Sequence, residues 1–542
     1  MDCGGRNKQW QFKFKRNDSL YLLHSSESRW CLRREGGDLG YRFVRTRDDH
    51  RRVKQIDGVD AAQEAVVGVL VCALPLLLLP PAADPFEVPK LSFAVLGAAA
   101  LVLLSVFGGT RARELTGLSY ALVEFGASAT LSTLFSMHWP TSLWGGHDSH
   151  AGLAYVFALI AIAMCSRGLQ QFGLWEQCLV ISTALTALYG VVQWMGADPI
   201  SWSRTAQWCG ALRPFSTLGH PNSLAAFLAM SAPLVLSTSV EALRRANSVQ
   251  GGFGILVVLV SAAVALPTYS RAGWIAFAVG LVVLFVLLPK SVIRIRALWI
   301  FLAFGIAVIV ASQSVAFRTR VFGLFSSPTR LAMYRAAVEI FLDQPLVGSG
   351  LDTFQLAFQA HRTPEYWAHE WGATPQRAHN DFLQVLATQG VFGAVALVAC
   401  CWFVLRALRR ARHHSDPITR TYIAGLAGCL AAAAVYALFS FHVTATALLA
   451  AIALGQLDHL SSHSAFGNGT TTRGNRAASR RAFRMAALTA LAAVVVFTFA
   501  VMPLVANIFV RRGIELEAHE PLQAQAAYEH ALRWMPFADT TW

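Results

Sequence analysis

A short polar motif, Ala378-His379-Asn380-Asp381, stands directly before an apolar run, 382–405, that is long enough to cross a bilayer. The preceding segment of about 65 residues carries six arginines and two further histidines, His361 and His369. Arginine binds phosphate through charge-assisted hydrogen bonds, and an imidazole with an ordinary pKa of about 6.5 exchanges protons at neutral pH. The combination indicates a site at the membrane edge that binds phosphate and uses His379 as a general base. The alternative is that His379 only caps the helix that follows it.

A second polar segment runs from Arg213 to Asn222 and ends where another apolar run begins. Pro221 disfavours helix at His220, so we expect Asn222 to cap the next helix. Helix N-termini attract anions through unpaired N–H groups and the helix dipole. Arg213 is therefore a candidate phosphate ligand, and the alternative is that its side chain extends to the lipid headgroups.

A third basic position, Arg271, follows Thr268-Tyr269-Ser270 between two apolar runs that are joined by almost no loop. A charge this deep costs about 2.5 kcal/mol or more at mid-membrane without a partner, and such residues usually face the protein interior and serve function. The alternative is a structural ion pair, for which Glu124 is the expected partner.

A fourth basic position lies on a predicted helix in the long polar segment. Serine before Pro328 marks the start of this helix, which should run to about Asp343. Arg330 and Tyr334 share one face, whereas Arg335 stands four residues before Glu339, the spacing of an intrahelical ion pair. We therefore expect Arg335 to be structural and Arg330 to be the freer phosphate ligand.

The histidines of this segment do not have the spacing of a metal site. His361, His369 and His379 are separated by eight and ten residues, whereas zinc sites usually contain closer pairs. The expected outer loops hold no acidic cluster for magnesium either, so we expect neither a metal nor a cofactor. Gly348-Ser-Gly350 is a weak anion-binding signal, and a plain turn is the simpler interpretation.

The elements that must position these residues are membrane spans. Hydrophobic residues make up 55% of the 542 residues and charged residues 14%, with a mean hydropathy of +0.46, against about 25% charged residues in a soluble domain. The chain is therefore predicted to be an all-α polytopic membrane protein. Thirteen spans are predicted at about 64–80, 91–109, 116–136, 151–166, 174–194, 222–240, 253–269, 273–289, 297–315, 382–405, 419–438, 442–457 and 485–506.

Basic residues set the orientation of these spans. With the N-terminus inside, the inner loops hold Arg111 and Arg113, Arg167, Arg244 and Arg245, Lys290 to Arg296, Arg406 to Arg412, and Arg473 to Arg484. This topology accounts for the net charge of +14, so nucleic acid is not an expected partner. The cysteines lie mostly in apolar runs and imply no disulfide framework.

The predicted organisation has five parts. They are a basic cytoplasmic N-terminal segment without regular structure (1–62), a transmembrane core (63–460) with a large periplasmic loop (316–381), a basic cytoplasmic loop (461–484), a last span (485–506) and a periplasmic tail (507–542). An over-long gene start is an alternative origin of the first part. The tail contains the small-residue spacing of one tetratricopeptide helix at 524–532. The aromatic residues of the outer loop 137–150 are typical of an interfacial belt.

These motifs, in this order and on one predicted side, resemble the O-antigen ligase superfamily, which includes O-linked protein oligosaccharyltransferases and O-antigen polymerases. The resemblance covers roughly residues 65 to 460 and rests on Arg213 to Asn222, Ser270-Arg271, Arg330 to Gly350 and His379 to Gly390. It implies a C-type glycosyltransferase-like bundle of about 12–13 helices and an undecaprenyl-diphosphate-linked glycan donor, at the periplasmic side of a bacterial inner membrane.

The resemblance also implies roles for individual residues. It implies that Arg213, Arg271 and Arg330 bind the diphosphate and that His379 activates the acceptor hydroxyl, with supporting roles for His220, Asn222, Tyr334, Arg335 and Asn380. The protein-glycosylating branch carries glutamine where this chain has His220, which favours the ligase branch and a lipid A–core acceptor. A protein hydroxyl or a glycan repeat remains the alternative acceptor.

Two other classes of function fit part of the pattern. A transporter or flippase of lipid-linked glycans also needs many spans and buried arginines, but its ionisable residues should follow a path through the bilayer rather than gather at the outer edge. A non-catalytic scaffold would dock partners through the tail.

Overall fold

The computed structural model describes residues 11–15, 19–23, 29–34, 41–46, 58–108, 115–146, 149–202, 207–208, 211–289, 328–370, 374–411, 416–462 and 478–536. The chain divides into two compact units, Met1–Gly58 and Val59–Trp542. The first contains four antiparallel strands in the order β1 (Gln11–Lys15), β2 (Ser19–Leu23), β3 (Arg29–Arg34) and β4 (Tyr41–Thr46). The expectation of no regular structure before residue 62 therefore differs from the structure. The strands could have been predicted from period-two alternation, as in Phe12-Lys13-Phe14 and Leu20-Tyr21-Leu22. The high charge of the segment instead led to the expectation of no regular structure.

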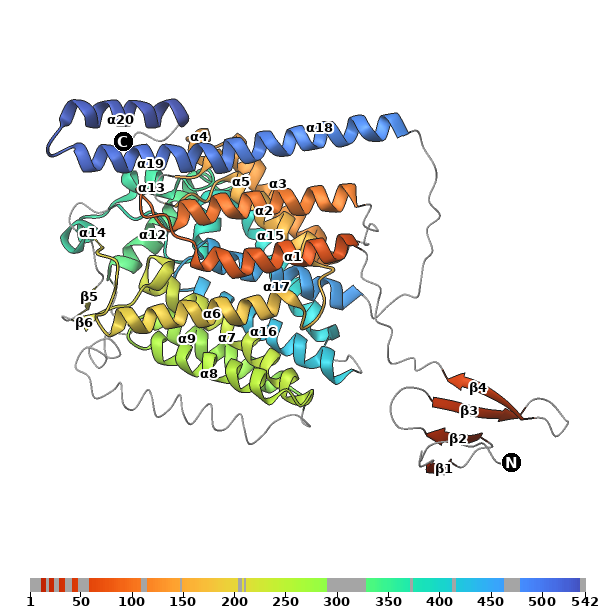
Figure 1. The fold of residues 1–542 in the computed structure, drawn as a ribbon. Coiled ribbons are helices and arrows are strands. Elements are labelled where there is room, and N and C mark those ends of the chain that lie inside the picture. Colours follow the sequence, from red (N-terminus) through yellow and green to blue (C-terminus); the bar gives the residue numbers. More distant parts are fainter. Residues whose placement is uncertain are drawn as a thin grey trace. The chain divides into compact units, whose positions relative to one another are not determined.

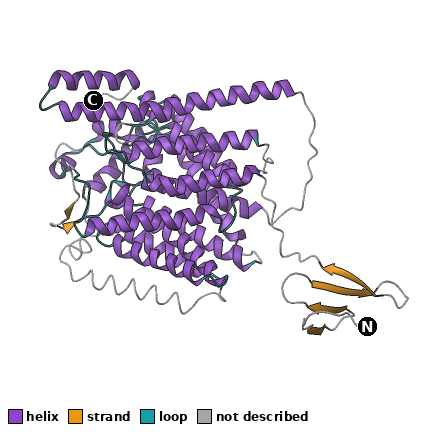
Figure 2. Cartoon of the chain, viewed as in Figure 1, coloured by secondary structure: helices purple, strands orange, loops and turns teal. Residues whose placement is uncertain are grey.

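The second unit is helical, as Figures 1 and 2 show, and confirms an all-α polytopic membrane protein. Eight helices in the described ranges are long and apolar enough to cross a bilayer. They are α1 with its 3-10 extension (Gly58–Leu76), α2 (Glu87–Phe107), α6 (Leu174–Trp194), α7 (Pro221–Arg244), α8 (Ser248–Ala265), α15 (Asp381–Ala411), α16 (Pro417–Ala437) and the continuous helix Met485–Leu516.

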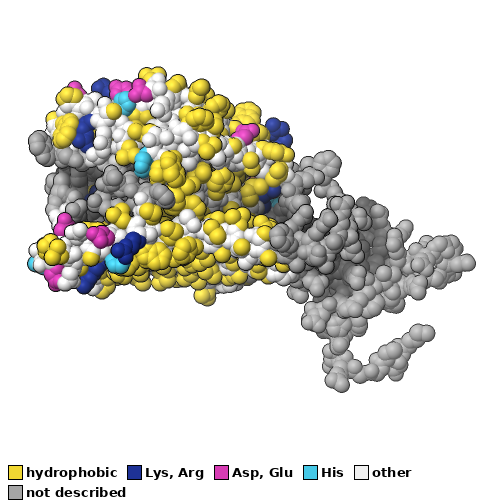
Figure 3. Space-filling view, turned by 90° about the horizontal axis from the view of Figure 1, so that it is seen from above, with side chains coloured by type: hydrophobic (Ala, Val, Ile, Leu, Met, Phe, Trp, Pro, Cys, Tyr) yellow, Lys and Arg dark blue, Asp and Glu magenta, His cyan; other side chains and the backbone are white. Residues whose placement is uncertain are grey.

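Four shorter or more polar helices occupy the other predicted spans that the structure describes. They are α3 (Gly117–Leu134), α5 (Leu153–Ser166), α9 (Arg271–Leu287) and α17 (Thr444–Ser462). The predicted span 297–315 lies outside the described residues. Hydrophobic side chains cover the middle of the face in Figure 3, and most charged ones on it gather toward the end that holds α19 (Met502–Leu516) and α20 (Pro521–Trp534).

Helix α7 is the centre of the bundle and is buried along its whole apolar length. It packs on α8, α9 and α16, and small residues allow the backbones to approach closely. A Cβ added to Gly428 of α16 would lie 2.6 Å from the carbonyl oxygen of Gly280 on α9, and one added to Gly425 would lie 2.3 Å from Ser237 Oγ of α7. This packing fixes the outer ends of α7, α9 and α16 relative to one another.

Helix α15 is kinked at Gly390, which has a φ of 62°. The segment 345–350 lies against the kink: Ser349 N donates to Ala387 O at 3.0 Å and Gly350 N donates to Thr388 O at 3.1 Å. The Gly348-Ser-Gly350 amides are thus used in a turn, in agreement with the simpler interpretation of that motif.

The tail begins as an antiparallel helix pair. Helix α20 returns along α19, with Ala524, Ala527 and Ala531 buried and the Tyr528 ring packed where Gly513 has no side chain. The helix predicted at 524–532 is therefore present.

Candidate active site

The candidate site is built from segments at one end of the bundle, and its centre is the turn before α15. Asn380 accepts hydrogen bonds from Phe382 N (3.0 Å) and Leu383 N (3.1 Å), so it caps α15, and its Nδ2 donates to Leu438 O at 3.0 Å. His379 precedes it with a φ of 54°, a left-handed conformation that costs free energy for a residue other than glycine. The helix cap is therefore Asn380, and the imidazole of His379 is left for another role.

The His379 imidazole is held by packing. Its ring centroid lies 5.2 Å from that of Phe441, and its buried Nδ1 has no hydrogen-bond partner among the described residues. The hydroxyl of Tyr334 lies 3.4 Å from the His379 carbonyl oxygen. An unsatisfied buried ring nitrogen is uncommon in a folded protein and is typical of an atom reserved for a ligand.

Arg213 is anchored beside the N-terminus of α7. Its Nε donates to Thr268 O at 2.7 Å and its Nη2 donates to Asn222 Oδ1 at 3.2 Å. Thr268 stands two residues before the Ser270 cap of α9, whose Oγ accepts from Gly273 N. Arg213 and Arg271 are thereby brought to neighbouring helix ends.

Arg330 lies on α12 (Pro328–Asp343), whose predicted limits are confirmed. Its charge acts on Arg271 and on His379, and the charge of Arg213 acts on His220, which in turn acts on His379. Contacts also connect these segments, because Arg213 bonds to Thr268 beside the start of α9 and Tyr334, one turn from Arg330, reaches the His379 carbonyl.

Electrostatics keep the His379 imidazole neutral. Burial, followed by the positive charges of Arg330, His220 and Arg377, lowers the pKa of His379 to about 4. Burial likewise lowers the pKa of the Arg213 guanidinium from its usual range. Positive charges that lie close together in a buried environment are costly to assemble unless an anion binds there.

A family model described as O-antigen ligase matches residues 255–398. This stretch of the chain is similar to O-antigen ligases. The matched stretch includes Arg271, Arg330 and His379, whereas Arg213 and Asn222 precede it. No curated protein matches the chain.

Three expectations about local contacts are corrected in this candidate site. The cap of α7 is His220, whose Nδ1 accepts from Asn222 N at 3.1 Å, because Pro221 is the first helical residue and places the extended residue two positions earlier than expected. Asn222 instead accepts the hydrogen bond from Arg213. Glu124 is exposed on α3 beside Cys400 and does not pair with Arg271.

The third correction concerns Arg335, which is exposed on α12. The carboxylate of Glu339 lies 3.7 Å from His361 Nδ1 instead of pairing with Arg335 within the described residues. The approach of the segment around His361 to α12 decided this pairing, and the helical spacing alone did not contain that information.

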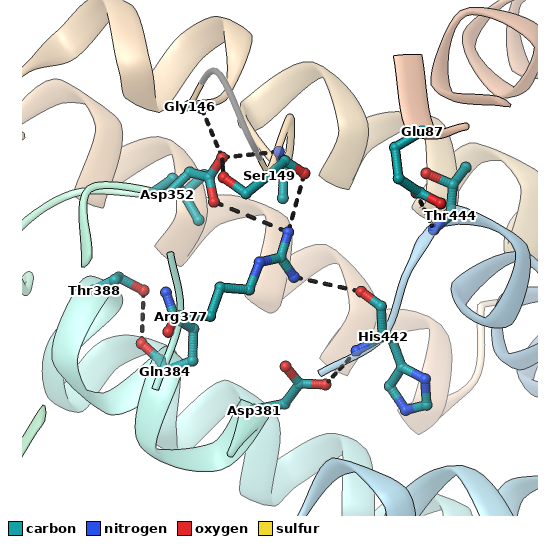
Figure 4. A network of polar contacts seen from close by, with 12 residues as sticks. Glu87, Gly146, Ser149, Asp352, Arg377, Asp381, Gln384, Thr388, His442 and Thr444 are labelled. Carbon is teal, nitrogen blue, oxygen red and sulfur yellow. Dashed lines mark hydrogen bonds and ion pairs between the residues drawn. The ribbon is translucent and has the colours of Figure 1, made fainter. Parts of the chain in front are cut away.

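A buried network on the far side of the His379 turn was not predicted (Figure 4). Arg377 donates to Ser149 O at 3.2 Å and His442 O at 3.4 Å, and its Nη2 lies 3.9 Å from Asp352 Oδ1. The guanidinium also lies 5.0 Å from the Phe441 ring centre. Two residues after His379, Asp381 Oδ2 accepts from His442 N at 3.1 Å. The turn that carries His379 is therefore fixed on both sides.

Asp352 holds the other end of the network. It is 6% exposed, and its Oδ2 accepts from Gly146 N (2.7 Å), Ser149 Oγ (2.6 Å) and Ala151 N (2.9 Å). The outer loop 137–150, expected to be an interfacial belt, thus also orients this carboxylate. The sequence feature that could have indicated this network is Arg377, which stands two residues before His379.

Proposed function

We propose that the protein transfers a glycan from undecaprenyl diphosphate to an acceptor hydroxyl, as an O-antigen ligase with lipid A–core as acceptor, at the periplasmic face of the bacterial inner membrane. One observation carries the proposal: Arg213 bonds to Thr268 beside the start of α9 at Arg271, and α12, which carries Arg330, contacts the His379 turn through Tyr334. The match of residues 255–398 to the O-antigen ligase family model supports a glycosyltransferase-like enzyme that uses a lipid-linked glycan.

The proposed roles follow from charge and from unused hydrogen-bonding atoms. Arg213, Arg271 and Arg330 bind the diphosphate and stabilise the negative charge that grows on it as the glycosidic bond breaks. His379 Nδ1 accepts the proton of the acceptor hydroxyl while that oxygen attacks the anomeric carbon. The C–O bond to the diphosphate breaks, undecaprenyl diphosphate leaves, and attack from the opposite face inverts the anomeric centre. No metal has a role in this sequence of events.

Each arginine should matter mainly in the transition state. A charge-assisted hydrogen bond contributes about 1.5–3 kcal/mol, which corresponds to about ten- to a hundredfold in rate. The arrangement also differs from that of a flippase, because the described ionisable residues of this site gather at one end of the helices.

The test uses purified protein, lipid-linked donor and lipid A–core acceptor in detergent, without an energy source. Glycosylated acceptor is expected with the native chain and should be lost with His379→Ala at equal protein level. Arg512→Gln, at an exposed position of α19 with no assigned role, is the control and should keep its activity. Donor translocation in vesicles without any glycosylated product would support the flippase instead, and product formed equally by His379→Ala would remove the proposed base.

A further inference from the structure

A basic cavity lies at the end of the bundle opposite the candidate active site, which the arginine distribution predicts to be cytoplasmic. It has a volume of about 170 Å³. The N-terminus of α3, the last turns of α15 and the end of α17 line it, through Thr116, Gly117, Leu118, Phe403, Arg406, Ala407, Arg410 and Ser461. Its volume is several times the roughly 30 Å³ that a water molecule occupies.

Two arginines provide the charge of this cavity. Arg406 and Arg410 are four residues apart on α15 and therefore lie on the same face of the helix. Within the described ranges neither guanidinium has a hydrogen bond or an ion pair, and no lining residue is acidic. The cavity thus contains two positive charges that no described lining residue compensates.

Asp458, which accepts a hydrogen bond from the lining residue Thr116, is already paired with Arg167. Its Oδ2 lies 2.8 Å from Arg167 Nε and accepts from Ser119 Oγ at 2.7 Å, and its Oδ1 accepts from Thr116 Oγ1. Arg167 and Asp458 are almost fully buried, with 5% and 2% of their side chains exposed. Arg167 thus compensates the charge of Asp458, and among the described lining residues none is acidic.

The walls of the cavity continue onto an apolar surface. Leu118, Phe403 and Ala407 form its nonpolar side, and Val398, Trp402 and Leu405 are exposed on the adjoining turns of α15. A ligand with a phosphate and an attached hydrocarbon fits both parts, because basic pockets between membrane helices on the cytoplasmic side bind anionic headgroups.

We propose that this cavity binds the phosphate group of an anionic membrane phospholipid through Arg406 and Arg410. A soluble phosphate is the other source of the same chemistry. The site is separate from the proposed transfer reaction and does not depend on it.

The test measures phosphatidylglycerol bound to the purified full-length protein in neutral detergent, by native mass spectrometry, with phosphatidylcholine as the uncharged comparison. Each arginine should contribute about fivefold to affinity, so Arg406→Gln with Arg410→Gln should weaken phosphatidylglycerol binding about 25-fold. Arg409→Gln is the matched control, because Arg409 is exposed on the same turn and does not line the cavity. It should leave the binding unchanged.

Three results would overturn the proposal. An equal loss with Arg409→Gln would mean general attraction of lipid to a basic helix end. Equal binding of phosphatidylcholine would remove the role of charge. Saturation by inorganic phosphate, with no phosphatidylglycerol bound, would assign the cavity to a soluble anion.

Discussion

The protonation of His379 should depend on whether the donor is bound. In the free protein burial and then the charges of Arg330, His220 and Arg377 lower its pKa to about 4. A bound diphosphate would add negative charge beside Arg330 and cancel part of this field, which raises the pKa of His379. Burial, the largest cause, remains, so the pKa should rise by about one unit and stay below about 6.5.

Steady-state kinetics separate the two states of the enzyme. The pH profile of kcat/KM reports the free enzyme, and that of kcat reports the enzyme with donor bound. We expect the acid limb of kcat/KM near pH 4 and that of kcat about one unit higher, measured from pH 4 to 8 with purified protein. Arg330→Gln should move the acid limb of kcat/KM to a higher pH, because the substitution removes a positive charge near His379. Acid limbs of kcat and kcat/KM that coincide, or an acid limb of kcat/KM at pH 6.5, would refute the reasoning.

Loss of folding must be distinguished from this titration. The folded-state pKa of His379 lies below the unfolded value of about 6.5, so the unfolded state binds its proton first as the pH falls. The fold therefore loses stability between pH 6.5 and 4, by no more than about 3 kcal/mol from this group. Thermal unfolding measured at each pH identifies any loss of activity that comes from unfolding.

Three substitutions test other parts of the arrangement. Arg213→Lys should lower kcat/KM for the donor about ten- to a hundredfold, because one ammonium cannot reproduce the two hydrogen bonds that the guanidinium donates to Thr268 and Asn222. Unchanged kinetics would exclude Arg213 from donor binding. Arg377→Gln should lower the free energy of unfolding by about 2 kcal/mol, because Asp352 loses one partner but keeps its three other hydrogen-bond donors. It should also slow glycan transfer without changing the affinity for the donor. If Arg377 has a purely structural role, the transfer rate per folded protein will be unchanged. Gly390→Ala should destabilise the protein by about 1–3 kcal/mol, measured by denaturant unfolding. The φ of 62° and a new Cβ only 2.5 Å from the Leu346 carbonyl carbon are both unfavourable. A variant as stable as the native chain would contradict strain at the kink.

Local pattern was sufficient for the helices. Apolar runs predicted the position of every span that the structure describes, and Pro328 and Pro345 predicted the limits of α12. These features depend on residues a few positions apart. The strands before residue 58 were missed because net charge was weighted above their alternation.

Residue type and hydropathy are local properties, so they were enough to predict the fold class, the candidate chemistry and the neighbourhood of His379. Which helix ends meet depends instead on long-range packing. The Arg377–Asp352 pair, the Arg213–Thr268 bond and the His442–Asp381 bond join residues 25 to 61 positions apart, and each depends on how the outer segments pack around α7 and α15. Such contacts come from the packing of many small residues at once, as at Gly280 and Gly428, and no local pattern specifies them.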